Sequence, residues 1–471
     1  MTFKADSTSP IQERTRHRAF LTVLAAFVLD IMDSTIVTVA IPAIQQDMHL
    51  SDSAVQWSVA GYFLSFAVLL VTGGRLGDLY GHRRLFLTGI AAFTVASLAC
   101  GFAGSGEALV LARVVQGATA ALMAPQVMAI VQILYSPTER IGRLAFFGLI
   151  GGLAAIAGPL VGGFVIEADL LGLGWRMIFL INLPVGLGGV IAGWRYLPRE
   201  RPGARQGLDA VGIVLLGISL LLLLLPLIDG RERGWPLWSF LVMAASVPTA
   251  GLFFVQQARR QRRVGDALFP PTLLQDRCYA LGVGCVLLFA TATGGLFLPL
   301  MLTLQKGLGF SAFEAALLHI PFAAGAMIGI VLLGRRLLPR FGKYVVIAGA
   351  LVMALAVVNV GSTLAHGGVV TIGASLLLAG IGMGMVSGPL TPLALARVDR
   401  AHAGMASGAF KSVQQIGGAL GAALLGTLYF MNHGALGSAT GAMGVVSLGI
   451  AFDLLCVAAL AGLMPRAPFA A

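Results

Sequence analysis

VLDIMDSTIVTVAIP, residues 28–42, places two carboxylates, Asp30 and Asp33, about one helical turn apart inside an apolar segment long enough to cross a bilayer. A charged side chain at bilayer depth costs about 2.5–3.5 kcal/mol on insertion scales, so it is normally retained for a proton, an ion or a substrate. Burial and a neighbouring like charge both disfavour the ionised form of an acid, which suits a group that loads and releases protons. We therefore assign proton coupling and substrate binding to Asp33, against the simpler interpretation of a carboxylate neutralised by an arginine. Asp30 is left open between the two interpretations.

The composition predicts an all-α polytopic membrane protein. The chain has 471 residues, of which 58% are hydrophobic and 11% charged, and its mean hydropathy is +0.90. Apolar runs of roughly 20 residues match a hydrocarbon core about 30 Å thick. We predict fourteen such spans, at 20–42, 55–73, 85–104, 107–133, 142–166, 176–197, 209–228, 237–257, 279–303, 312–333, 344–363, 369–391, 403–430 and 440–463.

The basic residues are distributed unevenly between the two sides of the predicted membrane. Of the 31 Lys and Arg residues, outer loops carry only Arg231, Arg233 and Lys306, and spans carry only Arg113, Arg176 and Lys411. With the N-terminus inside, all the others fall on the inner side. This asymmetry follows the positive-inside rule and supports an even number of spans with both termini cytoplasmic. The net charge of +11 therefore reports topology, and we expect no nucleic-acid partner.

Several kinds of site are absent from the sequence. The four cysteines form no CxxC pair, so we expect neither a disulfide framework nor a metal site. There is no GxxxxGK[ST] loop, so the energy source is not ATP bound to this chain, and no cofactor is expected. An enzyme would need a metal cluster, a nucleophile–base pair or a cofactor loop, and a channel would need a continuous polar lining. The first span is too long and too acidic for a cleavable signal, so we expect it to be retained.

The chain divides into two halves with an inserted pair of helices. Tight inner turns that combine glycine with Arg or Lys follow the second span (GGRLGDLYGHRRL, 73–85) and the tenth (LGRRLLPRFGKYV, 333–345), although the second turn lacks an acid. Two homologous halves are common in secondary transporters, whose substrate site lies near the midplane between them. We predict a cytoplasmic N-terminal arm (1–19), an N-terminal six-helix bundle (20–205), two inserted transmembrane helices (206–258) and a C-terminal six-helix bundle (259–471).

Four stretches together resemble the fourteen-helix drug:proton antiporter family of the major facilitator superfamily, and the resemblance covers nearly the whole chain. They are MDSTIVTVAIP (32–42), similar to the L-D-x-T-x-x-x-x-A-x-P signature; GRLGDLYGHRR (74–84), similar to the superfamily's loop between helices 2 and 3; RVVQGATAALMAP (113–125), similar to the R-x-x-Q-G motif; and GLIGGLAAIAGPLVGG (148–163), similar to the antiporter motif G-P-x-x-G-G. The resemblance implies two six-helix bundles plus two linker helices, and export in exchange for protons. In that family the acid at the position of Asp33 is implicated in proton coupling.

The loop after the second span is expected to form a conformational latch. By resemblance, its residues are Gly74, Asp78, Gly81 and Arg84. Gly81 permits a tight turn, and Asp78 can pair with Arg75 or Arg84 or accept hydrogen bonds from a helix N-terminus. His82 stands where relatives carry an arginine.

Arg113 is the only arginine well inside a span, so we expect it to pair with a carboxylate of the first span. A pairing that changes as Asp33 titrates would link protonation to conformation, and the alternative is a static buried ion pair. Gln116, one turn further along, is a secondary candidate for the same site.

The fifth span is expected to act as the antiporter hinge. By resemblance, the hinge comprises Gly158, Pro159, Gly162 and Gly163, and this motif separates exporters from uptake symporters. Pro159 removes a backbone hydrogen bond and is expected to kink the helix, while the glycines give a smooth face for close packing.

Lys411 departs from the family pattern, in which an amide is more common at this position. A lysine several turns into a span must reach the interface, pair or lose its proton. Asp453 is a candidate partner, and we include both in the proton and substrate site, with a structural role for Lys411 equally open. We assign Glu314 to a capping box with Ser311.

Asp209 is assigned to a helix N-cap. Aromatic residues near span ends, Trp57 and Tyr62 among them, are interpreted as an interfacial belt. A contact of Trp57 and Tyr62 with a lipophilic ligand is left open.

These features predict a proton-coupled antiporter that exports lipophilic, cationic or amphipathic drugs or toxic compounds by alternating access, as multidrug efflux proteins do in antibiotic resistance. The alternative is a dedicated exporter of a single metabolite or antibiotic, neutral or anionic, which Lys411 favours. We expect a multi-pass protein of the bacterial inner membrane, with protons, the lipid bilayer and a small lipophilic molecule as its partners. The sequence leaves open whether a periplasmic adaptor extends the path.

Overall fold

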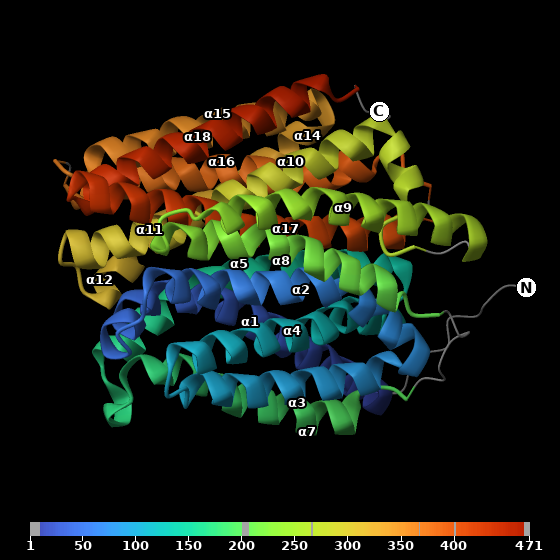
Figure 1. Cartoon of the computed structure of the whole chain (residues 1–471). Coiled ribbons are helices and arrows are strands. Elements are labelled where there is room, and N and C mark those ends of the chain that lie inside the picture. The colour runs from blue at the N-terminus through green and yellow to red at the C-terminus, as the bar shows by residue number, and fades with distance from the viewer. Residues whose placement is uncertain (1–9, 200–206, 265–266, 367, 400–401, 466–471) are drawn as a thin grey trace, which may run out of the picture.

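The computed structural model describes residues 10–199, 207–264, 267–366, 368–399 and 402–465, and within them every regular element is a helix (Figure 1). The longer helices are α1 (Pro10–Asp47), α2 (Asp52–Tyr80), α3 (His82–Gly101), α4 (Gly106–Leu134), α5 (Pro137–Glu167), α7 (Asn182–Tyr196), α8 (Ala210–Glu232), α9 (Leu237–Val264), α10 (Arg277–Gly294), α15 (Lys343–Thr363), α16 (Val369–Leu395), α17 (Ala403–Leu436) and α18 (Ala439–Leu463). The shorter ones are η1 (Leu170–Gly172), η2 (Gly174–Arg176), α6 (Met177–Leu180), η3 (Pro271–Gln275), α11 (Phe297–Leu302), α12 (Ala312–Leu317), α13 (His319–Met327), α14 (Arg335–Phe341) and two π-helical segments, η4 (Thr303–Gly307) and η5 (Ile328–Gly334).

Thirteen helical runs in the described part of the chain are long and apolar enough to cross a membrane. They coincide with thirteen of the fourteen predicted spans, so the prediction of an all-α polytopic protein is confirmed. The remaining predicted span, 403–430, falls in α17, which has 34 residues and so exceeds the ~20 needed to cross the hydrocarbon core. Lys411, two glutamines and frequent glycines make α17 less apolar than the thirteen.

The N-terminal caps predicted for two helices, at Ser311 and Asp209, are present in the structure. Ser311 accepts a hydrogen bond from the backbone of Glu314, whose carboxylate in turn accepts from the backbone N–H of Ser311, so the predicted capping box is confirmed. Asp209 accepts from the backbone N–H of Gly212 and caps α8, as predicted. The helix α1 begins at Pro10 and therefore includes the second part of the predicted N-terminal arm.

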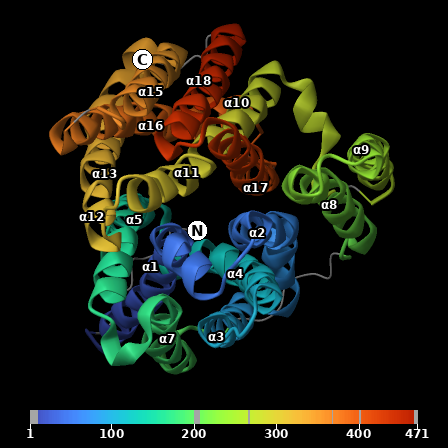
Figure 2. The same ribbon diagram turned by 60° about the vertical axis from the view of Figure 1, so that its left-hand side comes forward.

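The helices form two groups, with α8 and α9 beside them (Figure 2). One group contains α1–α5 and α7, and the other contains α10–α18. At one end α8 is fastened to α2, because Trp57 donates to Asp229 at 2.9 Å and Arg231 pairs with Asp52 at 2.7 Å. The helix α9 is peripheral: 17% of its most apolar stretch is buried, against 72% for Arg277–Gly307. The predicted division near residue 205 lies outside the described residues.

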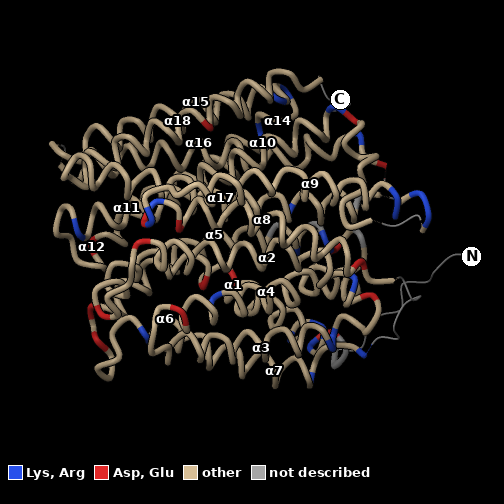
Figure 3. The backbone as a smooth tube through the Cα atoms, in the orientation of Figure 1, with Lys and Arg blue, Asp and Glu red and all other residues tan. Residues whose placement is uncertain are grey.

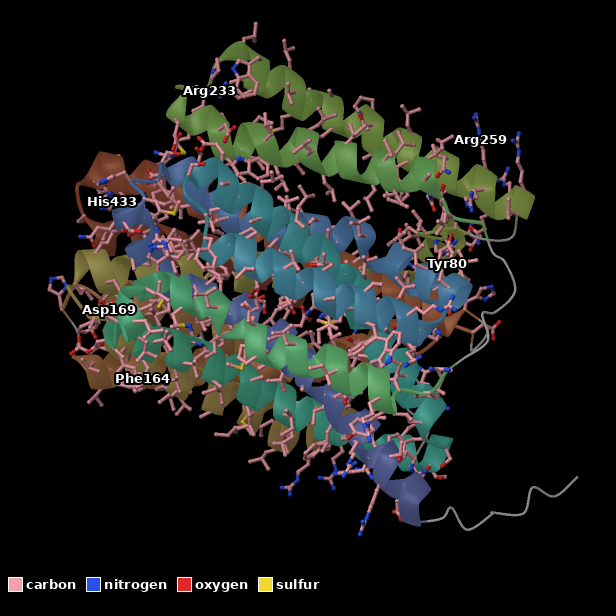
Figure 4. The ribbon with its side chains drawn as sticks, turned by 90° about the horizontal axis from the view of Figure 1, so that it is seen from below. Tyr80, Phe164, Asp169, Arg233, Arg259 and His433 are labelled. Carbon is pink, nitrogen blue, oxygen red and sulfur yellow. The ribbon has the colours of Figure 1, made fainter. Side chains whose placement is uncertain are left out.

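Successive helix ends alternate between two ends of the molecule. Tyr80 and Arg259 lie at the end where the N-terminus emerges, and Asp169, Arg233 and His433 lie at the other (Figure 4). Lys and Arg residues gather at the end that carries both chain termini (Figure 3). The predicted topology, with both termini cytoplasmic, depends on this concentration of Lys and Arg at one end.

The two groups touch mainly through five pairs of helices: α1 with α11 and with α12, α2 with α17, and α5 with α12 and with α13. Hydrogen bonds between the groups lie at the end opposite the termini. Gln305 donates to the backbone oxygen of Val39 at 2.9 Å, and Lys306 donates to Gln45 at 2.7 Å. Ser311 also donates to Glu167 at 2.8 Å. The groups are therefore closed against each other at this end.

Each of the two basic turns contains a glycine with a positive φ. Gly81, between α2 and α3, has φ +94°, and Gly342, between α14 and α15, has φ +52°. Each donates its N–H at 2.8 Å to a carbonyl four residues earlier, which ends the preceding helix. Only glycine adopts such positive φ values without strain, so both turns require a glycine.

Candidate functional site

Four helices bring polar side chains together around Asp33, which is fully buried in the middle of α1. The surrounding residues are Ser97 of α3, Arg113 and Gln116 of α4, and Asn182 of α7, each no more than 3% exposed. The helix α4 supplies two of them because Arg113 and Gln116 are three positions apart and so lie on one face. We call these five residues the Asp33 cluster.

Both oxygens of Asp33 are occupied. Arg113 donates from Nη1 to Oδ2 at 2.9 Å, and the amides of Gln116 and Asn182 each donate to Oδ1 at 2.7 Å. The same two amides lie within hydrogen-bond distance of the Ser97 hydroxyl, at 2.9 and 2.8 Å. The carboxylate expected to pair with Arg113 is thus Asp33, and its charge is balanced inside the cluster.

Arg113 is also held by groups other than Asp33. Its Nε donates to the backbone oxygen of Ser58 at 3.1 Å, and its Nη1 donates to Gln116 Oε1 at 2.6 Å. The guanidinium lies 4.4 Å from the centre of the Tyr62 ring, a cation–π distance. Arg113 and Asp33 thus form a buried ion pair in this conformation.

Asp30 has a different environment from Asp33. It is half-buried, and its Oδ1 accepts a single hydrogen bond, at 3.0 Å, from the hydroxyl of Tyr62. In the described part of the chain no cation lies within ion-pair distance of Asp30. Tyr62 therefore connects two parts of the site: its hydroxyl binds Asp30, and its ring faces Arg113 of the Asp33 cluster.

Lys411 lies on α17, in the other group of helices. Its ammonium is exposed, donates to Gln414 Oε1 at 2.9 Å and interacts electrostatically with Asp30. Asp453 of α18, suggested as its partner, makes no hydrogen bond or ion pair with Lys411 among the residues described. That suggestion is wrong, because α17 directs Lys411 toward the first group of helices while Asp453 is half-buried on another helix.

The residues of the predicted latch are spread over one turn and the adjacent ends of α2 and α3. Asp78 contacts the Nε2 atom of His82 at 3.4 Å, and the other ring nitrogen of His82 is 2.8 Å from Gln126. Asp78 therefore contacts His82, the histidine that stands where relatives carry an arginine. Arg84 is exposed at the start of α3. Arg75 donates to the backbone oxygen of Ala267, which ties α2 to the segment that follows α9.

Gly74, the first residue of the predicted latch, lies near Pro125 of α4. A Cβ atom added at Gly74 would be 3.7 Å from the Cβ atom of Pro125, an ordinary contact distance. This position therefore packs against α4 without requiring a glycine.

The predicted hinge residues lie between α5 and its neighbours on two sides. A Cβ atom at Gly158 would be 2.1 Å from Thr35 Oγ1, and one at Gly162 would be 2.6 Å from Ile36, both on α1. On the opposite side, a Cβ atom at Gly163 would be 2.7 Å from the backbone oxygen of Ala312, in the second group. The helix continues through Pro159 from Pro137 to Glu167 without ending.

Three residues of the site were missed by sequence reasoning. Ser97 and Asn182 are small polar residues inside apolar spans, and no motif singles them out. Tyr62 was assigned to the interfacial belt, which is wrong because its side chain is 1% exposed. The sequence contains one indication of these residues: each has a hydroxyl or an amide deep within an apolar span, where such a group requires a hydrogen-bond partner.

Comparison with known proteins gives consistent results. Residues 23–422 match the family model described as Major Facilitator Superfamily. The chain is 42% identical to a probable actinorhodin transporter of Streptomyces coelicolor over 427 residues, which cover 90% of this chain and 73% of that protein. It is 35% identical to the tetracenomycin C resistance and export protein of Streptomyces glaucescens, over 88% of this chain and 76% of that protein.

Among solved structures, a bacterial homologue of the human lysosomal transporter Spinster, in an inward-facing and occupied conformation, matches with a TM-score of 0.68. The match covers 96% of this chain and 97% of that one at 19% identity, which shows a shared fold.

Proposed function

Because this chain belongs to the Major Facilitator Superfamily, we propose that it exports an antibiotic-type small molecule across the membrane in exchange for protons. Membership makes the chain a polytopic membrane transporter and not an enzyme. Two relatives are named for the transport or export of antibiotics, actinorhodin and tetracenomycin C, which supports the dedicated exporter considered from the sequence. The G-P-x-x-G-G stretch of α5 supports the outward direction.

The observation that carries the proton-coupled part of this proposal is the contrast between the two carboxylates of α1. Protonating Asp33 would leave Arg113 buried without its counter-ion, and an uncompensated buried charge costs several kcal/mol. Asp30 is half-buried and accepts one hydrogen bond from a neutral hydroxyl, so it can gain a proton without leaving a charge unpaired. We therefore place the exchanged proton on Asp30 and give Asp33 the role of fixing Arg113.

The cycle follows from competition for Asp30. In the form closed at the end opposite the termini, a substrate enters from the basic end and donates a hydrogen bond to ionised Asp30. The two groups of helices then rock against each other, with α5 moving along its glycine face. A proton arriving from the other side takes the place of the substrate on Asp30 and releases it. A membrane potential of 100 mV contributes ~2.3 kcal/mol for each charge moved, which favours this direction.

The proposed orientation places both termini and the basic end in the cytoplasm of a bacterial cell, with the chain in the inner membrane. The concentration of Lys and Arg at that end supports it (Figure 3). The connections at the other end are short, so an adaptor protein, if one takes part, has only a small surface on which to dock.

The proposal is tested by proton movement in everted membrane vesicles. Actinorhodin, tetracenomycin C and a set of unrelated lipophilic cations are added in turn to energised vesicles, and a fluorescent dye reports the pH gradient. We expect one or both antibiotics to dissipate the gradient. Vesicles carrying Asp30→Asn are expected to lose this response completely, because an amide takes up no proton in this range.

Two outcomes would contradict parts of the proposal. Dissipation by many unrelated cations would favour the multidrug exporter over the dedicated one. Uptake of antibiotic into the vesicles without any change of the pH gradient would exclude proton exchange. Vesicles without the protein, and vesicles carrying Arg259→Gln at an exposed position of α9, serve as controls.

A further inference from the structure

Lys411 lies on an exposed face of the N-terminal part of α17. Gly404, Ser407 and Lys411 are exposed and Gln414 is half-buried, and their spacing of three or four positions puts them on one side of the helix. The helix runs from the end that carries the chain termini toward His433 at the opposite end (Figure 4). The exposed positions extend from the start of α17, at the basic end, to Lys411, about two helical turns into the helix.

This face of α17 is turned toward α2. A Cβ atom at Gly408 would be 3.9 Å from Val71, and one at Gly418 would be 3.3 Å from the ring of Phe63. Lys411 is three positions after Gly408 and seven before Gly418, spacings that put all three on one side of α17, so Lys411 faces the interface between α17 and α2. Tyr62, which binds Asp30, is the neighbour of Phe63 on α2.

Asp30 and Lys411 thus face the same interface from opposite groups, and their charges interact. They form no direct ion pair among the described residues. The Lys411 ammonium has three donors, of which one is used by Gln414, and within the described ranges the Asp30 carboxylate accepts only from Tyr62. Each charge therefore keeps free hydrogen-bonding capacity toward the interface.

The opposed charges determine which ligand fits between them. A cation drawn to Asp30 is repelled by Lys411, and an anion drawn to Lys411 is repelled by Asp30. A molecule with an acidic or carbonyl group at one end and a hydrogen-bond donor or cation at the other satisfies both residues. The half-buried ring of Phe63, beside Tyr62 on α2, suits a planar aromatic body.

We propose that Asp30 and Lys411 together select aromatic substrates that are dipolar and neutral overall, and that Lys411 is the residue that sets this specificity. The inference rests on the proposed export function and names its substrate class. Lys411 binds the acidic end of the substrate, while the donor end occupies Asp30 and competes there with the proton. Because only the donor end competes with the proton, exchange does not require a cationic substrate.

The test uses two dyes that share one aromatic body. Rhodamine B is a zwitterion, and its ethyl ester is a cation because it lacks the carboxylate. Binding of each dye to the purified protein in detergent is followed by fluorescence polarisation, which does not depend on transport. We expect wild-type protein to bind rhodamine B about tenfold more tightly than the ester, a difference of 1.4 kcal/mol.

Substitutions of Lys411 identify the cause of the preference. Lys411→Gln is expected to remove the preference, Lys411→Glu to reverse it in favour of the ester, and Lys411→Arg to keep it. Arg259→Gln, which removes a positive charge on α9, is expected to leave it unchanged. Elution as a single symmetric species in size-exclusion chromatography shows that each variant is folded. If Lys411→Glu does not fold, the comparison of wild type with Lys411→Gln is sufficient for the test.

Equal affinity of wild-type protein for the two dyes would overturn the inference, as would a preference that persists in Lys411→Gln. The proposed function fails separately, if no compound moves protons in vesicles containing wild-type protein. A dye preference that depends on Lys411 would stand even in that case.

Discussion

Replacing Arg113 with methionine is expected to destabilise the protein by about 3–5 kcal/mol, the usual cost of leaving one member of a buried ion pair without its partner. Asp33 is fully buried, and Arg113 provides its only cation, at 2.9 Å, among the residues described. The amides of Gln116 and Asn182 would still donate to the carboxylate but cannot balance its charge. Thermal unfolding of the purified protein in detergent measures the loss.

The double variant Asp33→Asn, Arg113→Met separates charge balance from packing. Because it removes both charges together, we expect it to regain most of the stability lost in Arg113→Met. Arg259→Met, at an exposed position, is the matched control and is expected to unfold like the wild type. An Arg113→Met protein as stable as the wild type, or a double variant as unstable as the single one, would show that the pair does not hold the four helices of the Asp33 cluster together.

Replacing Gly163 with valine is expected to abolish most transport by preventing closure at the end opposite the termini. A Cβ atom at Gly163 would be 2.7 Å from the backbone oxygen of Ala312 and 2.8 Å from the Cα atom of Phe313. Backbone atoms cannot move aside as a flexible side chain can, so α5 and α12 must separate. Overpacking of this kind costs about 1–3 kcal/mol. A change of that size moves a two-state equilibrium by about fivefold to about 150-fold.

The shift is measured as a distance between spin labels on the two groups of helices. Leu171, after α5, and Val370, at the start of α16, are both exposed and accept labels without disturbing the contacts between the groups. We expect a longer distance in Gly163→Val than in wild type, together with lost transport. Gly148→Val is the control on the same helix, because a Cβ atom there would have no neighbour within 4 Å. Equal distance distributions for wild type and Gly163→Val would contradict the role given to this contact.

Features that depend on one segment could be predicted from the sequence. The spans follow from runs of apolar residues, and the caps at Asp209 and Ser311 follow from local hydrogen bonds. The partner of Arg113 could be predicted because few charges lie deep in spans, so that an arginine there has few carboxylates to choose from. These cases need no knowledge of which helices are neighbours.

Features that depend on helix packing could not be predicted in the same way. Asn182 and Ser97 reach Asp33 only because α3 and α7 pack beside α1 and α4, and their rotation is fixed by close glycine contacts such as that of Gly186 with Thr94. The same limit explains the wrong partner suggested for Lys411. Asp453 is nearer in sequence, but α17 presents Lys411 to α1 and α2 instead.

The two carboxylates of α1 show how strongly the surroundings determine a role. Asp33 and Asp30 are three residues apart, and the sequence favoured Asp33 because it occupies the family's acidic position. In the structure Asp33 is fixed by three donors, whereas Asp30 has one donor and access to the interface. The residue with the weaker sequence signal is therefore the better candidate for the exchanged proton.

Proton release on substrate binding is the most direct measurement of this exchange. Purified protein in weakly buffered detergent solution is mixed with saturating tetracenomycin C or rhodamine B, and a pH indicator records protons set free. We predict release from the wild type and from the double variant Asp33→Asn, Arg113→Met, and none from Asp30→Asn. Undiminished release from Asp30→Asn, together with its loss in the double variant, would contradict the assignment and return the proton to Asp33.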